Sequence, residues 1–390
     1  MKKDAVAAQR SRILFFLPTL PHYRNSFFSL LTSDLKETHE ILVAHGTPPK
    51  QGKTIRHESV KGFNSKVCIA KQYSLFGYRI VWLRGLLPLF VRFSPDIVII
   101  LFNYGVLTFW IVVLLCKIKN IPIAFWGSGH KRPEIKGLKL HLRNMVSDWI
   151  LGLATAHICY GSRYSDELKY KRISPERIFI AQNTIDIEGL PNCADLNRDV
   201  CRGQFAILPS ETLFLFVGAV IKNKKLDIAI RCVNDLLNRG QKLKFFIIGD
   251  GAEKDSLQQL ILGLGIETKV KVLGPKYGSA LSPYFLAADA FLLPGTGGLA
   301  INEAMAYGLP IISTEGDGTA YDLLFNGVNG FFLNNDLNNL NHALDNFLHL
   351  PPAKRHEMGE KSKEIIFAKA RIGNMLSGFR TAIEFLTGQH

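Results

Sequence analysis

A glycine-rich loop between a predicted strand and a predicted helix carries the residue types in this sequence that could do chemistry. The stretch PGTGGLAINEAMAYGLPIIST covers residues 294–314 and follows an apolar run, 290–293, that predicts a buried strand. A helix is expected over 299–307, before Gly308 and Pro310 end it. Because the first N–H groups of a helix lack intrahelical partners, this order of elements indicates an anion site.

Side chains in and after the loop suit a nucleotide. Thr296 stands among three residues, Gly295, Gly297 and Gly298, that have no Cβ atom, so a phosphate can approach the backbone. Glu303 lies one turn into the helix, where its carboxylate could accept two ribose hydroxyls. Glycine loops before helices are also common as plain turns. Whether this loop is a turn or a nucleotide-binding site therefore has to be judged from the neighbouring segments.

Three further segments repeat the order of strand, turn and helix. FLFVGAVIKNKKLDIAI (214–230) places Gly218, Lys224 and Lys225 after a strand, KFFIIGDGAEKDSLQQL (244–260) places Gly249 and Gly251 in a turn, and Gly274 follows the next strand. Open α/β sheets bind ligands at the carboxyl ends of their strands. Each segment alone could be a solvated lysine pair or a simple turn, but the set in this order favours a binding site.

The same alternation of strand and helix runs along the whole chain and predicts α/β architecture with two parallel-sheet domains. We expect domains over 1–195 and 196–370, and a helix over 371–390 that crosses back to the first domain. A helical pattern fills 338–349 and 353–387. Apolar strands are expected at 13–17, 41–44, 97–101, 122–126, 156–160, 178–180, 213–217, 244–248, 270–273, 290–293 and 310–313.

Composition agrees with two globular domains. The chain has 390 residues, 47% of them hydrophobic, so each half can bury a core. Six cysteines at scattered positions form no CxxC pair, which indicates reduced thiols in a cytoplasmic protein and no zinc framework. No signal peptide is visible, and no metal cluster is evident.

Charge is unevenly distributed between the halves. Residues 1–190 carry 27 Lys+Arg and 13 Asp+Glu, whereas residues 191–390 carry 20 of each, so the net +14 lies in the first half. That half should face an anionic partner. Nucleic acid is disfavoured because the basic residues accompany no known reader motif.

One apolar stretch, 97–118, carries a single charged residue, Lys117, and is long enough to span a bilayer. Pro95 and Asp96 precede the β-branched run IVIIL, a turn follows at 103–105, and Pro122 opens another apolar run. A strand, helix and strand explain this punctuation better than a single membrane helix.

The C-terminal half resembles the group 1 (family 4) nucleotide-sugar glycosyltransferases of GT-B fold. The matching segments are FVGAVIKNKK, IIGDGAE, YFLAADAFLLPG, GLAINEAMAYGLPII and DGTAYDLLFNGVNGFF, which cover about residues 213–333. The N-terminal half is similar more loosely, through LPTLPHYRNSFFSLL, PDIVII, IPIAFWGSGH and FIAQNTID. The resemblance implies a Rossmann-like acceptor domain and a Rossmann-like donor domain with a cleft between them.

The resemblance also assigns roles. It implies that Lys224 neutralises the donor diphosphate, that Gly298, Leu299 and Ala300 lie beside that diphosphate, and that Glu303 holds the ribose. Gly249 and Gly251 match the turn near the nucleotide. The family retains anomeric configuration without a metal or other cofactor, and its donors are UDP-, GDP- or similar sugars. Fixed positive charge would stabilise the charge that develops on the leaving diphosphate.

Three positions depart from the family pattern. Gly295 stands where the family has the first of two glutamates, Ala219 where an arginine often accompanies the lysine, and Ser128 where many relatives have histidine. These changes leave nucleotide binding intact but put the sugar contacts in doubt. Asp317 or Thr319 could supply the lost contact.

Acceptor residues are expected after strands of the first half. His22, Tyr23 and Arg24 follow the first strand, and His130, Lys131 and Arg132 follow another. His130 is a candidate catalytic residue, although a lone histidine is often structural. Two stretches, 78–93 and 136–153, interleave basic and apolar residues like helices that lie on anionic membranes, although their apolar residues could equally be core.

These features predict a retaining glycosyltransferase, cytoplasmic and peripheral on the inner face of the cell membrane. It would move a sugar from a nucleotide-sugar donor to a lipid-linked glycan in capsule or O-antigen synthesis. A GT-B nucleotide-sugar epimerase and an inactive nucleotide-sugar-binding partner subunit are the alternatives. The donor sugar, its base, the acceptor, the linkage and the oligomeric state are not specified by the sequence.

Overall fold

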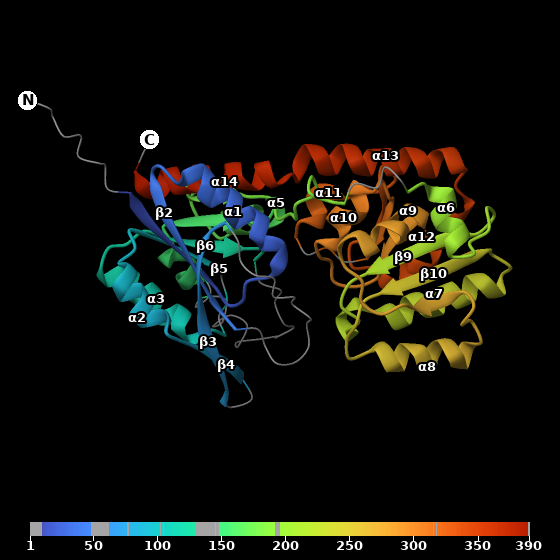
Figure 1. The fold of residues 1–390 in the computed structure, drawn as a ribbon, viewed down its shortest axis with the longest axis horizontal. Coiled ribbons are helices and arrows are strands. Elements are labelled where there is room, and N and C mark those ends of the chain that lie inside the picture. Colours follow the sequence, from blue (N-terminus) through green and yellow to red (C-terminus); the bar gives the residue numbers. More distant parts are fainter. Residues whose placement is uncertain are drawn as a thin grey trace, which may run out of the picture. The chain divides into compact units, whose positions relative to one another are not determined.

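Two compact units make up the protein in a computed structural model that describes residues 10–47, 62–75, 78–101, 103, 105–129, 145, 148–191, 196–314, 316 and 318–388 (Figure 1). The first unit holds the described residues up to Gln182 together with those from Gly373 onward. The second unit is Asn183–Ile372. Each unit contains one sheet with flanking helices, which confirms the predicted α/β architecture.

The sheet of the first unit has eight strands. They are β1 (Ser11–Leu17), β2 (His39–Gly46), β3 (Asn64–Leu75), β4 (Tyr78–Arg84), β5 (Ile97–Leu101), β6 (Ile123–Gly127), β7 (Ala156–Cys159) and β8 (Ile178–Ile180). Their order in the sheet is β4-β3-β2-β1-β5-β6-β7-β8. Successive strands move outward on one side of β1 and then on the other, so the strand order reverses between β1 and β5.

Helices cover both faces of this sheet. They are α1 (Asn25–Leu35), α2 (Leu86–Phe93), α3 (Leu107–Ile118), α5 (Ser162–Tyr170) and α14 (Ile372–Thr387), with short 3-10 turns η1 (His22–Arg24) and η2 (Pro175–Arg177). Successive side chains of a strand point to opposite faces. Accordingly Phe15 packs on Phe28 of α1 and Phe379 of α14, whereas Leu14 and Phe16 join the core formed with α2 and α3.

A hairpin of β3 and β4 is the main element that sequence patterning missed. The stretch 78–93 was expected to form one amphipathic helix, and this is wrong for its first half: residues 78–84 are a strand that pairs antiparallel with β3. Gly85, with φ +95°, then turns the chain into α2. Because glycine adopts positive φ without strain, it allows this abrupt change from strand to helix.

The second unit has a six-stranded parallel sheet. Its strands are β9 (Thr212–Val217), β10 (Leu243–Ile248), β11 (Val270–Val272), β12 (Ala290–Leu293), β13 (Ile311–Ser313) and β14 (Gly330–Phe332). The order β11-β10-β9-β12-β13-β14 is that of a Rossmann fold and reverses between β9 and β12. The strand β14 was not predicted from the sequence.

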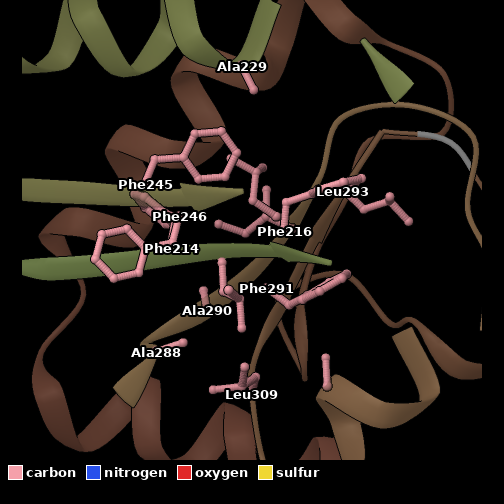
Figure 2. Packing of buried hydrophobic residues seen from close by; sticks show 14 of the residues in the cluster. Phe214, Phe216, Ala229, Phe245, Phe246, Ala288, Ala290, Phe291, Leu293 and Leu309 are labelled. Atoms are coloured by element: carbon pink, nitrogen blue, oxygen red, sulfur yellow. The ribbon is translucent and has the colours of Figure 1, made fainter. Parts of the chain in front are cut away.

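Helices pack on both faces of this second sheet. They are α6 (Arg198–Gln204), α7 (Leu226–Asn238), α8 (Lys254–Leu264), α9 (Ser282–Ala287), α10 (Ala300–Ala306), α11 (Ala320–Leu323), α12 (Leu340–His349) and α13 (Pro352–Lys369), with 3-10 turns η3 (Lys222–Lys224), η4 (Gly278–Ala280) and η5 (Leu337–Asn339). Figure 2 shows the core between the layers, where Phe214, Phe216 and Phe291 are fully buried. This dense apolar packing fixes where the strands end, and therefore where the loops that follow them begin.

The helical tract expected over 353–387 is two helices. Ala370 leaves helical conformation with φ −131° and ψ 38°, and its carbonyl accepts a hydrogen bond from the Thr184 hydroxyl at 2.5 Å. The apolar stretch 97–118 contains β5 and α3, so the predicted strand and helix are both present. Among the described residues, no helix is both long and apolar enough to cross a bilayer.

Candidate active site

The candidate site lies where the strand order of the second sheet reverses. The loop after β9 contains Lys224, and the loop after β12 contains Gly295 and Thr296. In open α/β sheets the loops at such a reversal diverge and leave a crevice that binds ligands. The structure therefore places two of the predicted phosphate-binding segments next to each other at this reversal.

Backbone hydrogen bonds join four loops at this edge into one rim. Gly218 N donates to Ile248 O at 2.9 Å, and Gly249 N donates to Gly274 O at 3.0 Å. On the other side of the reversal, Thr296 N donates to Asn223 O at 3.1 Å. The loops after β9, β10, β11 and β12 are thus positioned by one another as well as by their strands.

Two glycines are needed because these loops approach so closely. A Cβ atom on Gly249, whose φ is +148°, would lie 1.8 Å from Gly218 O. A Cβ atom on Gly295 would lie 2.3 Å from Asn223 O and 2.6 Å from the carbonyl carbon of Lys224. The glycine that replaces the family's first glutamate therefore has a structural reason, because no side chain fits at position 295 in this loop arrangement.

Lys224 adds a second connection across the same gap. Its Nζ donates to Thr296 O at 2.6 Å, and the side chain is partly buried. Thr296 in turn donates its hydroxyl to Asn223 O at 3.1 Å. Lys225 instead occupies a left-handed conformation, with φ +53°, at the start of α7. The two adjacent lysines therefore have different environments, and Lys224 is the one held against the glycine-rich loop.

Glu303 lies in the first turn of α10, the helix that follows the glycine-rich loop. Its side chain is partly buried, and this burial raises the pKa of the carboxyl from 4.5 to about 7. The helix begins with Leu299 as its N-cap, and Asn302 N is the donor to Leu299 O at 3.0 Å. A carboxyl group buried without an ion pair among the described residues suits a neutral hydroxyl-bearing ligand such as a ribose.

A buried polar junction, which the sequence did not reveal, anchors this helix. The Asn302 side chain is 1% exposed and donates to Thr184 Oγ1 at 3.1 Å, while Thr184 donates to Ala370 O at 2.5 Å. Asn183 and Ile372 are the first and last residues of the second unit. The residue beside Glu303 is therefore tied to both segments through which the chain enters and leaves this unit.

Predicted acceptor residues have mixed positions. His22 is exposed and Tyr23 partly exposed, but Arg24 is 3% exposed, with its guanidinium carbon 4.9 Å from the centre of the Trp126 ring. Cation–π contact of this kind stabilises a buried guanidinium. His130, Lys131, Arg132 and Asp317, and the basic stretch 136–143, lie outside the described residues. Thr319 is buried in the second unit.

A larger cavity of about 780 Å³ lies at the opposite edge of the second sheet, near the starts of β9 and β12. Its charged side chains are largely paired: Arg198 contacts Asp289 at 2.6 Å, and Arg355 donates to Thr212 Oγ1 at 3.0 Å. It contains none of the residues predicted to bind the nucleotide. We therefore place the site at the rim of loops and not in this cavity.

Comparison with known families agrees with this geometry. Residues 197–365 match the family model described as Glycosyl transferases group 1. This segment, 169 of the 390 residues, is therefore similar to the group 1 glycosyltransferases. The matched segment contains every residue of the loop rim as well as Glu303. The resemblance inferred from the sequence is thus confirmed over this segment.

Curated glycosyltransferases align with about a third of the chain. An uncharacterized glycosyltransferase of Methanocaldococcus jannaschii, MJ1607, is 30% identical over 135 residues, 34% of each chain. The amylovoran biosynthesis glycosyltransferase AmsK of Erwinia amylovora is 32% identical over 126 residues, 30% of this chain and 31% of AmsK. The alignments span about a third of these relatives.

The fold likeness extends over the whole chain. The crystal structure of Anabaena Alr3699/HepE in complex with UDP matches with a TM-score of 0.67 at 17% identity, covering 96% of this chain and 99% of that chain. At this level of identity the likeness shows the fold alone. That fold is GT-B, with two Rossmann-like parallel-sheet domains.

A substitution at Gly295 tests the close approach of the two loops. Gly295→Ala places a methyl group against Asn223 O, so we expect a loss of about 1–3 kcal/mol in the free energy of unfolding, as for other overpacked sites. Gly298→Ala is the matched control, because a Cβ atom there meets nothing within 4 Å. Urea denaturation measures both. Equal stability losses would contradict the loop arrangement.

Glu303 should give stability a distinctive pH dependence. Because burial raises its folded-state pKa from 4.5 to about 7, the folded protein loses stability as pH rises through this window, and the full penalty is present above pH 7. Glu303→Gln should therefore unfold like wild type near pH 4 but be more stable by up to ~3 kcal/mol at pH 8. Denaturation at both pH values checks this. A variant less stable than wild type at pH 8 would contradict it.

Proposed function

We propose that this protein is a retaining glycosyltransferase that moves a sugar from a nucleotide-sugar donor to a lipid-linked glycan. One observation carries the proposal: Lys224, the glycine-rich loop at 295–298 and Glu303 gather at the strand-order reversal of the group 1 segment. That combination offers a cation, open backbone and a carboxyl group over the length of a nucleoside diphosphate.

The donor would lie across the rim of loops. Its diphosphate faces Lys224 and the N-terminal turn of α10, where backbone N–H groups and the helix dipole favour negative charge. Its ribose hydroxyls bond to the Glu303 carboxylate. UDP is the nucleotide that we expect, and the support for this is the fold likeness to Alr3699/HepE, which was crystallised with UDP.

In the proposed reaction an acceptor hydroxyl attacks the anomeric carbon from the side of the leaving group. The bond from that carbon to the diphosphate oxygen breaks, the bond to the acceptor oxygen forms, and the proton passes to the departing phosphate oxygen. Lys224 stabilises the charge that grows on the diphosphate. Attack from the face of the leaving group retains the configuration, and because the departing phosphate takes the proton, no separate base is required.

Contacts to the donor sugar must come from groups other than the missing glutamate. A side chain at position 295 would collide with Asn223, so a carboxylate cannot be restored there without moving the loop. We propose that the backbone of residues 297–299 replaces it. The partly exposed Gly297, Gly298 and Leu299 lie at the correct end of α10 for this role.

Surface composition of the first unit supports a membrane-bound acceptor. Val91 of α2 and Leu114 and Ile118 of α3 are 68%, 59% and 68% exposed, and α2 packs beside α3 (Figure 1). Arg92 and Lys117 are exposed on the same two helices. Apolar and basic side chains together bind anionic bilayers. We propose that these helices rest peripherally on the inner face of the cell membrane.

Synthesis of a surface polysaccharide such as capsule or O-antigen is the setting that we propose. The relative AmsK, named for amylovoran biosynthesis, supports this setting. The acceptor would then be a glycan chain growing on a lipid at the cytoplasmic face, with the membrane-facing helices keeping the enzyme at the surface where its acceptor is held.

Lys224 gives the sharpest test of the proposed reaction. Lys224→Ala should lower the rate of sugar transfer, or of slow UDP-sugar hydrolysis, by roughly 10²–10³, the scale of losing one transition-state charge contact. Lys225→Ala, the adjacent matched control, should change the rate far less. Steady-state kinetics with a panel of UDP-sugars measures both, and equal losses in the two variants would refute the assignment.

Membrane binding is tested by removing apolar side chains from α3. Leu114→Ser with Ile118→Ser should reduce recovery of the protein with vesicles that contain anionic lipid, since two membrane-facing anchors are lost. Leu208→Ser with Leu262→Ser is the matched control, because these second-unit residues are 59% and 67% exposed. Vesicle sedimentation decides the matter, and equal recovery of the two double variants would exclude α3 as the contact.

A further inference from the structure

A second, smaller cavity lies at the strand-order reversal of the first sheet. Its volume is about 280 Å³, and its lining comes from the loops after β1, β2 and β5 and from the β3–β4 hairpin. This is the position in the first unit that corresponds to the nucleotide crevice in the second. None of its described lining residues is among the acceptor residues predicted from the sequence.

The hairpin forms one wall of this cavity. Strand β3 pairs in parallel with β2 only through Cys68, and residues 69–75 continue past the end of β2 to pair with β4. Gln72 of β3 stands opposite Val81 of β4, and both line the cavity. Figure 1 shows the hairpin extending beyond α2 and α3. The hairpin thus converts an open sheet edge into a cup, which we call the hairpin cup.

Hydrogen bonds hold the walls of the hairpin cup in place. Val81 N donates to Gly105 O at 2.8 Å, which fixes β4 to the loop after β5. Asn103 Oδ1 accepts from Gly105 N at 3.0 Å, and Thr47 Oγ1 accepts from Ala70 N at 3.0 Å. Both polar side chains are oriented by these bonds. A cup that is already formed binds a ligand without first having to order its own groups.

Each polar side chain in the cup keeps unused hydrogen-bonding capacity. Within the described part of the chain, the Asn103 amide nitrogen, the Gln72 carboxamide and the Thr19 hydroxyl have no hydrogen-bond partner, and Thr47 can still donate its proton. The described lining contains no charged side chain. The remaining walls are apolar, from Pro18 and Val81.

We infer that the hairpin cup binds a neutral sugar ring of the acceptor, an inference that rests on the proposed glycosyltransferase function. Hydroxyl groups both donate and accept, and so do the amide and hydroxyl groups of the cup. The apolar walls suit the C–H surface of a ring. The volume is slightly below the usual range for drug-sized ligands, as expected for a small ring.

A phosphate group or a carboxylate is the competing kind of ligand. Burial of an anion requires paired charge, which the described lining does not supply, whereas a neutral polyol requires only hydrogen bonds. The basic charge of the first half would then contact the lipid or its phosphates outside the cup. The cup selects the uncharged terminal sugar that presents the attacking hydroxyl.

Binding of simple glycosides without donor tests the inference. We expect methyl α-glucoside, methyl α-galactoside, methyl α-mannoside or methyl α-rhamnoside to bind the full chain at millimolar concentrations by saturation-transfer NMR. Gln72→Ala and Asn103→Ala should each weaken the best of these ligands about two- to tenfold, the equivalent of one neutral hydrogen bond. Inorganic phosphate and glucuronate should not displace it.

The control is Lys71→Ala, because Lys71 is exposed on the opposite face of β3 from Gln72 and does not line the cup. It should bind the glycoside like wild type. Any of three results would overturn the inference. The first is that none of the four glycosides binds at 50-fold excess over a millimolar Kd. The others are equal glycoside affinity in all variants and displacement of the glycoside by phosphate or glucuronate. Donor binding and hydrolysis, measured separately on wild type, report on the proposed function. Glycoside binding without donor turnover would therefore contradict the proposed glycosyltransferase function but not the proposal that the hairpin cup binds a sugar.

Discussion

The close contact between the loops after β9 and β12 is the constraint on which the candidate active site depends. Thr296 and Asn223 share a backbone hydrogen bond, and Lys224 closes the same gap with its side chain. That contact is possible only because Gly295 has no Cβ atom. Gly295, which stands where the family has its first glutamate, is therefore a condition for the close approach of the two loops that holds Lys224 against Thr296.

A second constraint acts on the carboxyl side of the same site. Asn302 and Glu303 are neighbours on α10, and Asn302 is buried in a polar junction with Thr184, whereas Glu303 is the carboxyl group that we propose binds the nucleotide. Buried amides are costly unless their bonds are satisfied, so Asn302 fixes the rotation of the helix. Because Thr184 also binds Ala370 O, movement of either connecting segment is mechanically linked to Glu303.

Local patterns predicted the parts of this fold that are periodic and missed the parts set by distant contacts. Most strands and the glycine-rich turns could be found because apolar runs and glycines mark them. The β3–β4 hairpin could not, since its outer face exposes Val67, Ile69 and Tyr73 and its polar and apolar residues do not follow one face. The polar junction joins Asn302 to Thr184, which lie more than a hundred positions apart in the sequence, and to Ala370. No spacing of residues in the sequence could predict this junction. Arg24 was predicted to bind the acceptor, and no sequence pattern indicated that its guanidinium would be buried beside the rings of Trp126 and Tyr160.

In the function that we propose, the two sheets use the same topological position for chemically opposite ligands. At the reversal in the second sheet, Lys224 and the start of α10 would supply positive charge to a diphosphate that becomes more negative as the proposed reaction proceeds. At the reversal in the first sheet, the described lining is neutral, and its hydrogen-bonding groups suit an acceptor hydroxyl that must remain nucleophilic. A strong cation in the cup would hold phosphates of the lipid there and compete with the sugar. Keeping the basic residues on the outer surface and out of the cup separates attraction to the membrane from recognition of the acceptor, so each can be strong without weakening the other.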